Sequence, residues 1–311
     1  RVSHKISLET VQPYILFVGC VLSIICLISF IIVYGCFKST FSVRVLILLH
    51  IMVALLGKSV LWIVIVGPTI FPNFFDYRSL DWTCNVVFSL HFYTLLVTAF
   101  WMVVLAHYLN QKLTRKHCLR DKFPWVQYML FSWALPVVLV SLWATLMVTF
   151  DETTCWINYT KSRLFWVISF PLVAAFVVNF VYLINILRVF VKRISLVRSP
   201  TQQKQIRNAK RDIVILFPVL GINHLLFLYN PGGQIGKYYM FFHAVFQSVQ
   251  GILVSLLCCY LSSDVRKSFW KGVRSCCFRD ERCHANGLNS THVPAMIPGV
   301  QRKRVSFAEG L

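Results

Sequence analysis

Charged residues are scarce in this sequence, and acidic residues are the rarest of them. Asp, Glu, Lys and Arg make up 14% of the 311 residues, with 11 Asp and Glu against 31 Lys and Arg. Soluble domains contain about 25% charged residues, so this composition excludes a soluble protein. The hydrophobic fraction of 57% and the mean hydropathy of +0.66 agree with this. We therefore expect an integral membrane protein.

Motifs for catalysis and metal binding are also lacking. We find no nucleophile–base pair, no phosphate-binding loop and no cluster of metal ligands, because the nine histidines are scattered without carboxylate or cysteine spacing. Neither an enzyme nor a bound cofactor is expected. We also expect no signal peptide within this sequence, since residues 1–10 are polar and have no small-residue cleavage site. The first residue is Arg1 rather than Met, which suggests a processed or trimmed form of a longer protein.

Seven apolar runs are each long enough to cross a bilayer as a helix, which takes about 20 residues. We therefore predict an all-α fold, a bundle of seven transmembrane helices. The runs lie at about 14–37, 44–67, 83–109, 124–150, 164–191, 211–229 and 236–261. The last run contains four polar residues that should face the interior of the bundle: His243, Gln247, Ser248 and Gln250.

The basic residues predict the orientation of the bundle. If the N-terminus is outside, the inner segments hold 24 Lys and Arg and the outer segments hold 6, while Lys58 lies within a span. The positive-inside rule then places the N-terminus outside and the C-terminus inside. The net charge of +20 becomes juxtamembrane charge, which anionic membrane lipid attracts. A nucleic-acid partner is therefore not needed to explain it.

This topology divides the chain into four segments. Residues 1–13 form an extracellular stub and residues 14–261 form the seven-helix domain. Residues 262–275 form a short amphipathic helix, helix 8, in which Phe269 and Trp270 lie among basic residues. Residues 276–311 form a cytoplasmic tail that we expect to be flexible. In this tail Ser306 follows three basic residues and is a candidate phosphorylation site.

Seven helices with an external N-terminus suggest a G-protein-coupled receptor. The odd number argues against a transporter built from two equal halves. Cys84, at the outer end of the third run, and Cys155, in the second outer loop, both face the oxidising side, where a disulfide persists. Such a bond would tie this loop to the third helix. In the same loop, Asn158 begins an Asn-Tyr-Thr glycosylation sequon.

Several segments resemble the secretin family (class B) of peptide-hormone receptors. Cys155-Trp156 and the run 170–190 are similar to the second outer loop and fifth helix of that family. The segments FPVLGINHLLFLYNPG (217–232) and QSVQGILVSLLCCYLSSDVRKSF (247–269) are closer to the branch of corticotropin-releasing-factor and insect diuretic-hormone receptors. Phe100-Trp101-Met102 fits the third helix. The resemblance extends over about residues 14–275.

The resemblance implies a plasma-membrane receptor for a corticotropin-releasing-factor-like or diuretic-hormone-like peptide. Its expected partners are a heterotrimeric G protein, of the stimulatory type that raises cyclic AMP, and arrestin. Peptide receptors of this family carry a disulfide-rich extracellular domain before the first helix, whereas about 13 residues precede it here. We expect this domain to have been left out of the chain. The alternative is a relative that has no such domain.

Lys58 is the candidate for the central ligand-binding residue. It lies 14 residues beyond Arg44, which is about 21 Å along a helix, so it belongs to the outer half of the membrane core. A cation at this depth needs water, an acid or a ligand. The resemblance implies a pocket cation for an acidic or carbonyl group of the peptide N-terminus, since the family has an arginine here. The alternative is a lysine that snorkels to the outer interface.

Further polar residues are candidates for the lining of the same pocket. For each of them, hydrogen bonding between helices is the alternative. The candidates are His91, Tyr93, Asn179, Asn223, His224 and Gln247.

Pro218 and Gly221 predict a hinge in the sixth helix, because Pro218 removes a helical hydrogen bond and Gly221 adds backbone freedom. In the family, helix six opens at this point to admit the G protein; a static kink is the alternative. Gln250 and Gly251 match the central activation region of the seventh helix. The expected G-protein contacts are Arg44, Arg188, Lys192, Arg211, Asp264 and Arg266.

One departure from the family bears on signalling. The family has a buried polar network of His, Glu, Thr and Tyr on the inner side, and all four positions are replaced here, by Leu48, Leu105, Ile213 and Cys258. An apolar contact is expected in its place, or a substitute pair of His50 and His107; the alternative is that each histidine has its own partners. The loss motivates a second interpretation, a non-signalling decoy or scavenger receptor. An adhesion-type receptor activated by a tethered segment is a third.

Overall fold

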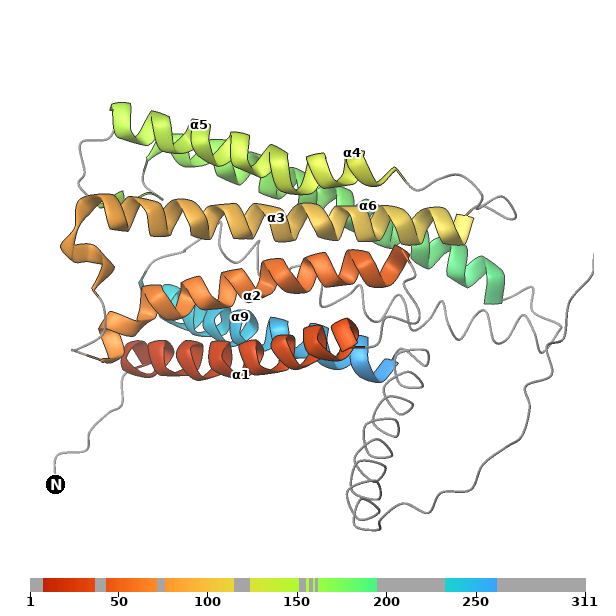
Figure 1. Cartoon of the computed structure of the whole chain (residues 1–311), viewed down its shortest axis with the longest axis horizontal. Helices are drawn as coiled ribbons and strands as arrows, with labels where there is room; N and C mark the ends of the chain where they lie inside the picture. Colours follow the sequence, from red (N-terminus) through yellow and green to blue (C-terminus); the bar gives the residue numbers. More distant parts are fainter. Residues whose placement is uncertain are drawn as a thin grey trace, which may run out of the picture. The chain divides into compact units, whose positions relative to one another are not determined.

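The computed structural model describes residues 8–36, 43–71, 76–114, 124–150, 162–194 and 233–261, together with Cys155, Trp156 and Tyr159. These residues form an all-helical bundle (Figure 1), as predicted. Six segments are long and apolar enough to cross a membrane. The long helices are α1 (Leu8–Cys36), α2 (Val43–Ile70), α3 (Asp81–Thr114), α5 (Leu135–Phe150), α6 (Trp166–Ile194) and α9 (Gly233–Leu261). The predicted sixth span at 211–229 and helix 8 at 262–275 lie outside the described residues.

The fourth span is built from three consecutive elements. The α4 helix (Trp125–Met129) continues through the π-helical turn η2 (Leu130–Ala134) into α5. A π-helical turn changes the backbone hydrogen bonding locally, and here the hydroxyl group of Tyr93 donates to the carbonyl oxygen of Trp133 over 3.5 Å. Two short 3₁₀ turns, η1 (Tyr77–Ser79) and η4 (Arg163–Phe165), precede α3 and α6. The sequence did not predict the π-helical turn.

The α3 helix is the most buried span and packs against α2, α5 and α6, whereas α1 packs against α2 and α9. Figure 1 shows α1 beside α2 and α9, and α3 between α2 and the pair formed by α5 and α6. Several helices are longer than the apolar runs that predicted them. For example, α3 continues from the predicted end at residue 109 to Thr114, because a helix does not have to stop where its apolar stretch does.

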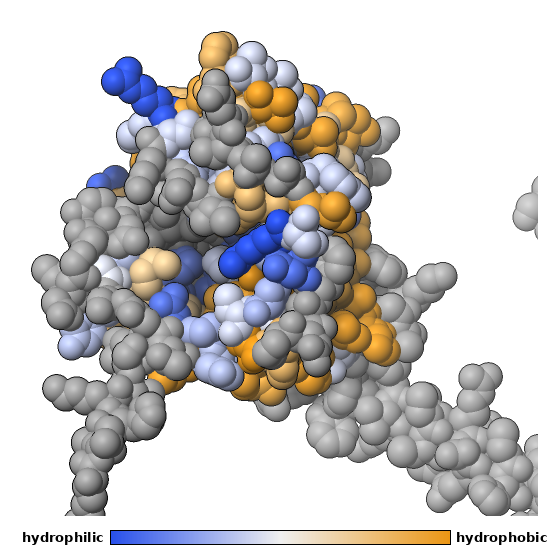
Figure 2. Space-filling model, turned by 90° about the vertical axis from the view of Figure 1, so that its left-hand side faces the viewer, coloured by the Kyte–Doolittle hydropathy of each residue, from blue (hydrophilic) through white to orange (hydrophobic). Residues whose placement is uncertain are grey.

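The predicted disulfide between Cys84 and Cys155 is present, with a Cα–Cα distance of 5.7 Å. We call the end of the bundle where α3 begins the disulfide end (left in Figure 1), and the end near Thr114 the opposite end. In Figure 2, which shows the disulfide end, hydrophilic side chains gather around the middle of the face, and hydrophobic side chains lie along its right-hand margin.

Beneath the disulfide, five aromatic rings hold the second loop against the bundle. The ring of Phe92 on α3 lies 4.8 Å from that of Trp143 on α5 and 5.0 Å from that of Tyr159. Trp156 reaches Trp143 at 5.0 Å, and Tyr159 reaches Phe165 at 5.3 Å. Three of these pairs are edge-to-face and the Tyr159–Phe165 pair is tilted, and edge-to-face pairs add stabilisation beyond the area that they bury. Burial raises the pKa of Tyr159 well above its ordinary value, so its hydroxyl group stays protonated.

The contact between α1 and α9 depends on small residues. A Cβ atom added at Gly19 would overlap the Ser248 side chain, and one added at Gly251 would lie 2.7 Å from the hydroxyl oxygen of Ser23. This close approach lets the Ser23 hydroxyl donate to the carbonyl oxygen of Ser248 over 2.8 Å. Small residues that allow close backbone approach are typical of helix pairs in membranes.

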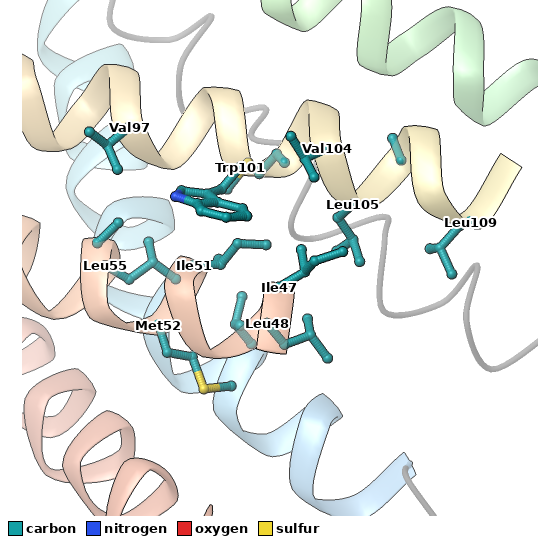
Figure 3. Close-up of a cluster of buried hydrophobic side chains, with 14 of the residues drawn as sticks. Ile47, Leu48, Ile51, Met52, Leu55, Val97, Trp101, Val104, Leu105 and Leu109 are labelled. Atoms are coloured by element: carbon teal, nitrogen blue, oxygen red, sulfur yellow. The ribbon is translucent and has the colours of Figure 1, made fainter. Parts of the chain in front are cut away.

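Toward the opposite end, the core between α2 and α3 is apolar (Figure 3). Ile47 and Ile51 of α2 face Trp101 and Leu105 of α3. Leu48 and Leu105, two of the four replaced network positions, are 5% and 1% exposed and belong to the same apolar core cluster. Ile213 and the side chain of Cys258 lie outside the described residues.

Gly19→Ala should lower the melting temperature of the purified protein in lipid nanodiscs, because the added methyl group would collide with Ser248. Gly57→Ala is the matched control, since its Cβ atom would lie 3.3 Å from Cγ2 of Thr94, a contact that a small side-chain shift can relieve. Alanine also has a helix propensity about 1 kcal/mol better than glycine, so the control should melt near the wild-type temperature or above it. Equal melting temperatures for the two variants would refute the close α1–α9 contact.

Tyr159→Ala should lower the melting temperature by roughly 6–12 °C, because it removes a ring packed against Phe92 and Phe165. Tyr159→Phe keeps the ring and should change the melting temperature little. Both substitutions leave the Asn-x-Thr sequon in place, so any glycan on Asn158 is the same in the two proteins. A large loss in the phenylalanine variant as well would show that the hydroxyl group, rather than ring packing, holds the loop.

Candidate functional site

Lys58 is buried near the middle of α2 and is only 2% exposed. It lies 15 residues from Val43 and 12 from Ile70, so its Cα atom is about 22 Å and 18 Å from the two ends of the helix. Its Nζ atom donates a hydrogen bond to Oε1 of Gln250 on α9 over 3.3 Å. This side chain therefore points into the bundle, and the snorkelling alternative is wrong.

Two histidines and a tryptophan lie near Lys58. Trp62 is one turn further along α2, and its ring centroid lies 5.0 Å from that of His91 on α3 and 6.3 Å from that of His243 on α9. His91 and His243 are 3% and 7% exposed. We call these residues the Lys58 cluster: Lys58, Trp62, His91, His243 and Gln250.

Within the described spans, the Lys58 cluster has no acidic residue near it in the sequence. None of the six candidate spans, from 11–32 to 238–256, contains an Asp or Glu residue. Among the described residues, the carbonyl oxygen of Gln250 is the acceptor for the ammonium group of Lys58, which has three N–H donors. Burying a cation is costly unless its charge is compensated. The arrangement is therefore complementary to a carboxylate or carbonyl group.

The four polar residues of α9 are buried as predicted, with exposures of 7% for His243 and Gln247 and 3% for Ser248 and Gln250. His243, Gln247 and Gln250 are spaced by four and three residues, which places them on one face of the helix. The sequence analysis did not assign His243 or Trp62 to the ligand site. The signals were present, because His243 shares the spacing of the two glutamines and Trp62 follows Lys58 by four residues.

The other predicted pocket residues are spread over the bundle. His91 joins the Lys58 cluster, whereas Tyr93 points toward the fourth span and donates to Trp133. Asn179 is 2% exposed on α6, and its Oδ1 atom has no hydrogen-bond partner within the described part of the chain. Asn223 and His224 lie outside the described residues, as do the hinge residues Pro218 and Gly221.

The predicted G-protein contacts that the structure describes lie toward the opposite end. Arg188 and Lys192 are exposed and four residues apart on α6, and Arg44 is half-buried near the start of α2. Gly251, assigned to the activation region, packs against Ser23. Several predicted sites fall outside the described residues: Arg211, Asp264, Arg266, Asn158 and Ser306.

His50 and His107 have separate partners. His50 stacks on Trp101 with a centroid distance of 4.4 Å and an interplanar angle of 6°. Nδ1 of His107 lies 2.9 Å from the hydroxyl oxygen of Tyr182, and its Nε2 atom lies 2.7 Å from Nε2 of Gln111. The described contacts thus favour two separately satisfied histidines over the substitute pair.

Relatives of the chain come from several hormone-receptor groups. It is 29% identical over 195 residues to the parathyroid hormone/parathyroid hormone-related peptide receptor of Didelphis virginiana, a match that covers 60% of this chain and 33% of that protein. Identity to the human vasoactive intestinal polypeptide receptor 2 is 29% over 189 residues, covering 60% and 42%. The corticotropin-releasing factor receptor 2 of Xenopus laevis is 24% identical over 257 residues, covering 81% and 60%.

These matches do not single out one hormone branch, and the chain spans between a third and three fifths of the length of these relatives. The family is shown by a broader match. Residues 9–254 match the family described as 7 transmembrane receptor (Secretin family), which agrees with the helical bundle and its candidate spans. The chain belongs to the secretin family of seven-transmembrane receptors, a family without catalytic activity.

Proposed function

We propose that this protein is a peptide-hormone receptor that binds its ligand through the disulfide end and activates a heterotrimeric G protein at the opposite end. The observation that carries this proposal is the Lys58 cluster, a buried group of basic residues without an acidic residue in any candidate span. Family membership and relatives named as hormone receptors support it.

The disulfide end is extracellular in this proposal. A disulfide persists in an oxidising compartment, and the Cys84–Cys155 bond ties the second loop to the start of α3. The 24 Lys and Arg in the segments on the other side, against 6 on this side, support the same orientation through the positive-inside rule. A receptor of this orientation in the plasma membrane presents the polar middle of the disulfide end to the hormone (Figure 2).

The group recognised by Lys58 is an acidic side chain or a carbonyl group near the N-terminus of the peptide. Such a group would compete with Gln250 for the Nζ atom of Lys58. Because the hydrogen bond between Lys58 and Gln250 joins α2 to α9, ligand binding would change the contact between these two helices. The flat ring of Trp62 would form a wall beside the bound group, between His91 and His243.

The proposed branch is that of the corticotropin-releasing-factor and diuretic-hormone receptors, with a stimulatory G protein and cyclic AMP as the output. Segments 217–232 and 247–269 support this branch. The match to the corticotropin-releasing factor receptor 2 of Xenopus laevis also covers 81% of the chain, although its identity of 24% is lower than that of the other relatives. By linkage, the G protein bound at the opposite end would raise the affinity for the peptide.

A second candidate function is a non-signalling receptor that captures peptide. The apolar residues Leu48 and Leu105 favour it, because the resemblance implies polar groups at these positions. Peptide binding without cyclic AMP or another G-protein output would identify this function.

Lys58→Gln in the full-length receptor should raise the peptide concentration for half-maximal cyclic AMP production by about 10- to 100-fold. The reason is that a charged hydrogen bond is worth about 1.5–3 kcal/mol. Lys58→Arg keeps the charge and should lose less potency. The measurement is cyclic AMP in cells that express equal surface amounts of each variant, tested with corticotropin-releasing-factor-like, diuretic-hormone-like and calcitonin-like peptides.

Lys112→Gln is the matched control, because this lysine lies near the opposite end, over the ring of Tyr108. It should leave the peptide potency unchanged. A response that survives Lys58→Gln unaltered would remove Lys58 from the ligand site. No response from any variant, with surface expression confirmed, would favour the peptide-capturing receptor or a different G protein.

A further inference from the structure

His107 and Tyr182 join α3 to α6, which is the fifth span, in the half of the bundle toward the opposite end. The Nδ1 atom of His107 lies 2.9 Å from the hydroxyl oxygen of Tyr182, a good hydrogen-bond distance. His107 precedes Thr114 by seven residues and Tyr182 precedes Ile194 by twelve. The bond therefore lies about 10 Å from the end of α3 and about 18 Å from the end of α6.

Gln111 determines which way this bond points. Its Nε2 atom, an amide donor, lies 2.7 Å from Nε2 of His107. This histidine nitrogen therefore accepts, and Nδ1 carries the proton of the neutral ring and donates it to Tyr182. Both nitrogens of His107 are thus used, one within α3 and one across to α6. The ring is held in place for its contact with Tyr182.

The bond is partly buried. Tyr182 packs against the core cluster that contains Trp101, Leu105 and Ile186. The Tyr128 ring of α4 lies 6.1 Å from that of His107. A hydrogen bond inside a protein is electrostatically stronger than the same bond in water. Interhelical hydrogen bonds measured in a membrane protein correspond to population changes of about 3- to 18-fold, which is enough to bias a helix between two positions.

Beyond Tyr182, α6 passes from buried to exposed surroundings. Ile186 is 1% exposed and belongs to the same core cluster, whereas Arg188 and Lys192 are exposed. The contact at Tyr182 therefore lies less than two helical turns before the exposed, cationic end of α6. The neighbouring core between α2 and α3 is lined by apolar residues, among them Ile47, Ile51 and Leu105, which cannot supply a directional bond.

We propose that the hydrogen bond between His107 and Tyr182 is a latch that holds α6 against α3 and sets the resting position of the α6 end. Its consequence for signalling rests on the proposed function. Release of the latch would let the end of α6 move and carry the exposed residues Arg188 and Lys192 toward the G protein. The latch itself can be measured without any signalling.

The test compares variants that remove the bond with variants that keep it. Tyr182→Phe removes one hydroxyl group and keeps the ring, and His107→Phe removes both ring nitrogens. Tyr14→Phe is the matched control, because it removes the same hydroxyl group from an exposed tyrosine on α1. Hydrogen–deuterium exchange of α6 peptides within 183–194 is measured by mass spectrometry on the full chain in lipid nanodiscs.

Tyr182→Phe should speed exchange of these amides by about 3- to 18-fold. His107→Phe should do the same, and the double variant should add little to either single change. Tyr14→Phe should leave exchange near the wild-type rate, and its effect should be additive with that of Tyr182→Phe. Unchanged exchange in Tyr182→Phe, or fully additive effects of the His107 and Tyr182 changes, would overturn the latch.

Cyclic AMP in cells separates this proposal from the proposed function. Higher basal signal in Tyr182→Phe, at equal surface expression, would support both. Faster exchange with no cyclic AMP response from any variant would support the latch and count against a stimulatory G protein as output. Peptide-induced cyclic AMP together with unchanged exchange and unchanged basal signal in Tyr182→Phe would support the receptor and reject the latch.

Discussion

The lipid bilayer offers almost no water to a polar group, and the structure depends on this constraint. A polar side chain inside the bundle is stabilised when it finds a partner on its own helix or on a neighbouring one. Ser23 donates to a carbonyl oxygen of α9, Lys58 donates to Gln250, and His107 pairs with Tyr182. These contacts lie at different places along the bundle and join different helix pairs. Polar side chains therefore specify which helices are neighbours, while apolar packing supplies the bulk of the contact.

The two halves of the bundle solve this problem differently. In the half toward the disulfide end, the basic residues gather around Lys58, and packed aromatic rings hold the second loop against the bundle. In the half toward the opposite end, leucines occupy positions where the resemblance implies polar groups, and the interhelical hydrogen bond lies on another face of α3. Interhelical hydrogen bonds at α9 and α6 therefore lie on either side of an apolar core between α2 and α3.

Hydropathy and charge counting predicted the helical class, the candidate spans and the pairing of Cys84 with Cys155, because these follow from composition and from the order of elements along the chain. They also predicted that the polar face of α9 is buried. They did not predict that Trp62 meets both His91 and His243, or that His107 meets Tyr182. Those contacts depend on how each helix is rotated about its axis and on its height relative to its neighbours. Side-chain packing between pairs of helices sets both quantities, and the apolar pattern of a single helix does not contain them.

The close contact of Gly19 with Ser248 also restricts how this sequence can evolve. A side chain larger than glycine at position 19 has no room unless the residue at 248 becomes smaller, and the same relation links Gly251 to Ser23. Either change alone disturbs the packing of α1 against α9. Lineages can therefore exchange these residues only in compensated pairs, although the two helices lie at opposite ends of the seven-helix sequence. The positions should covary among descendants of this gene.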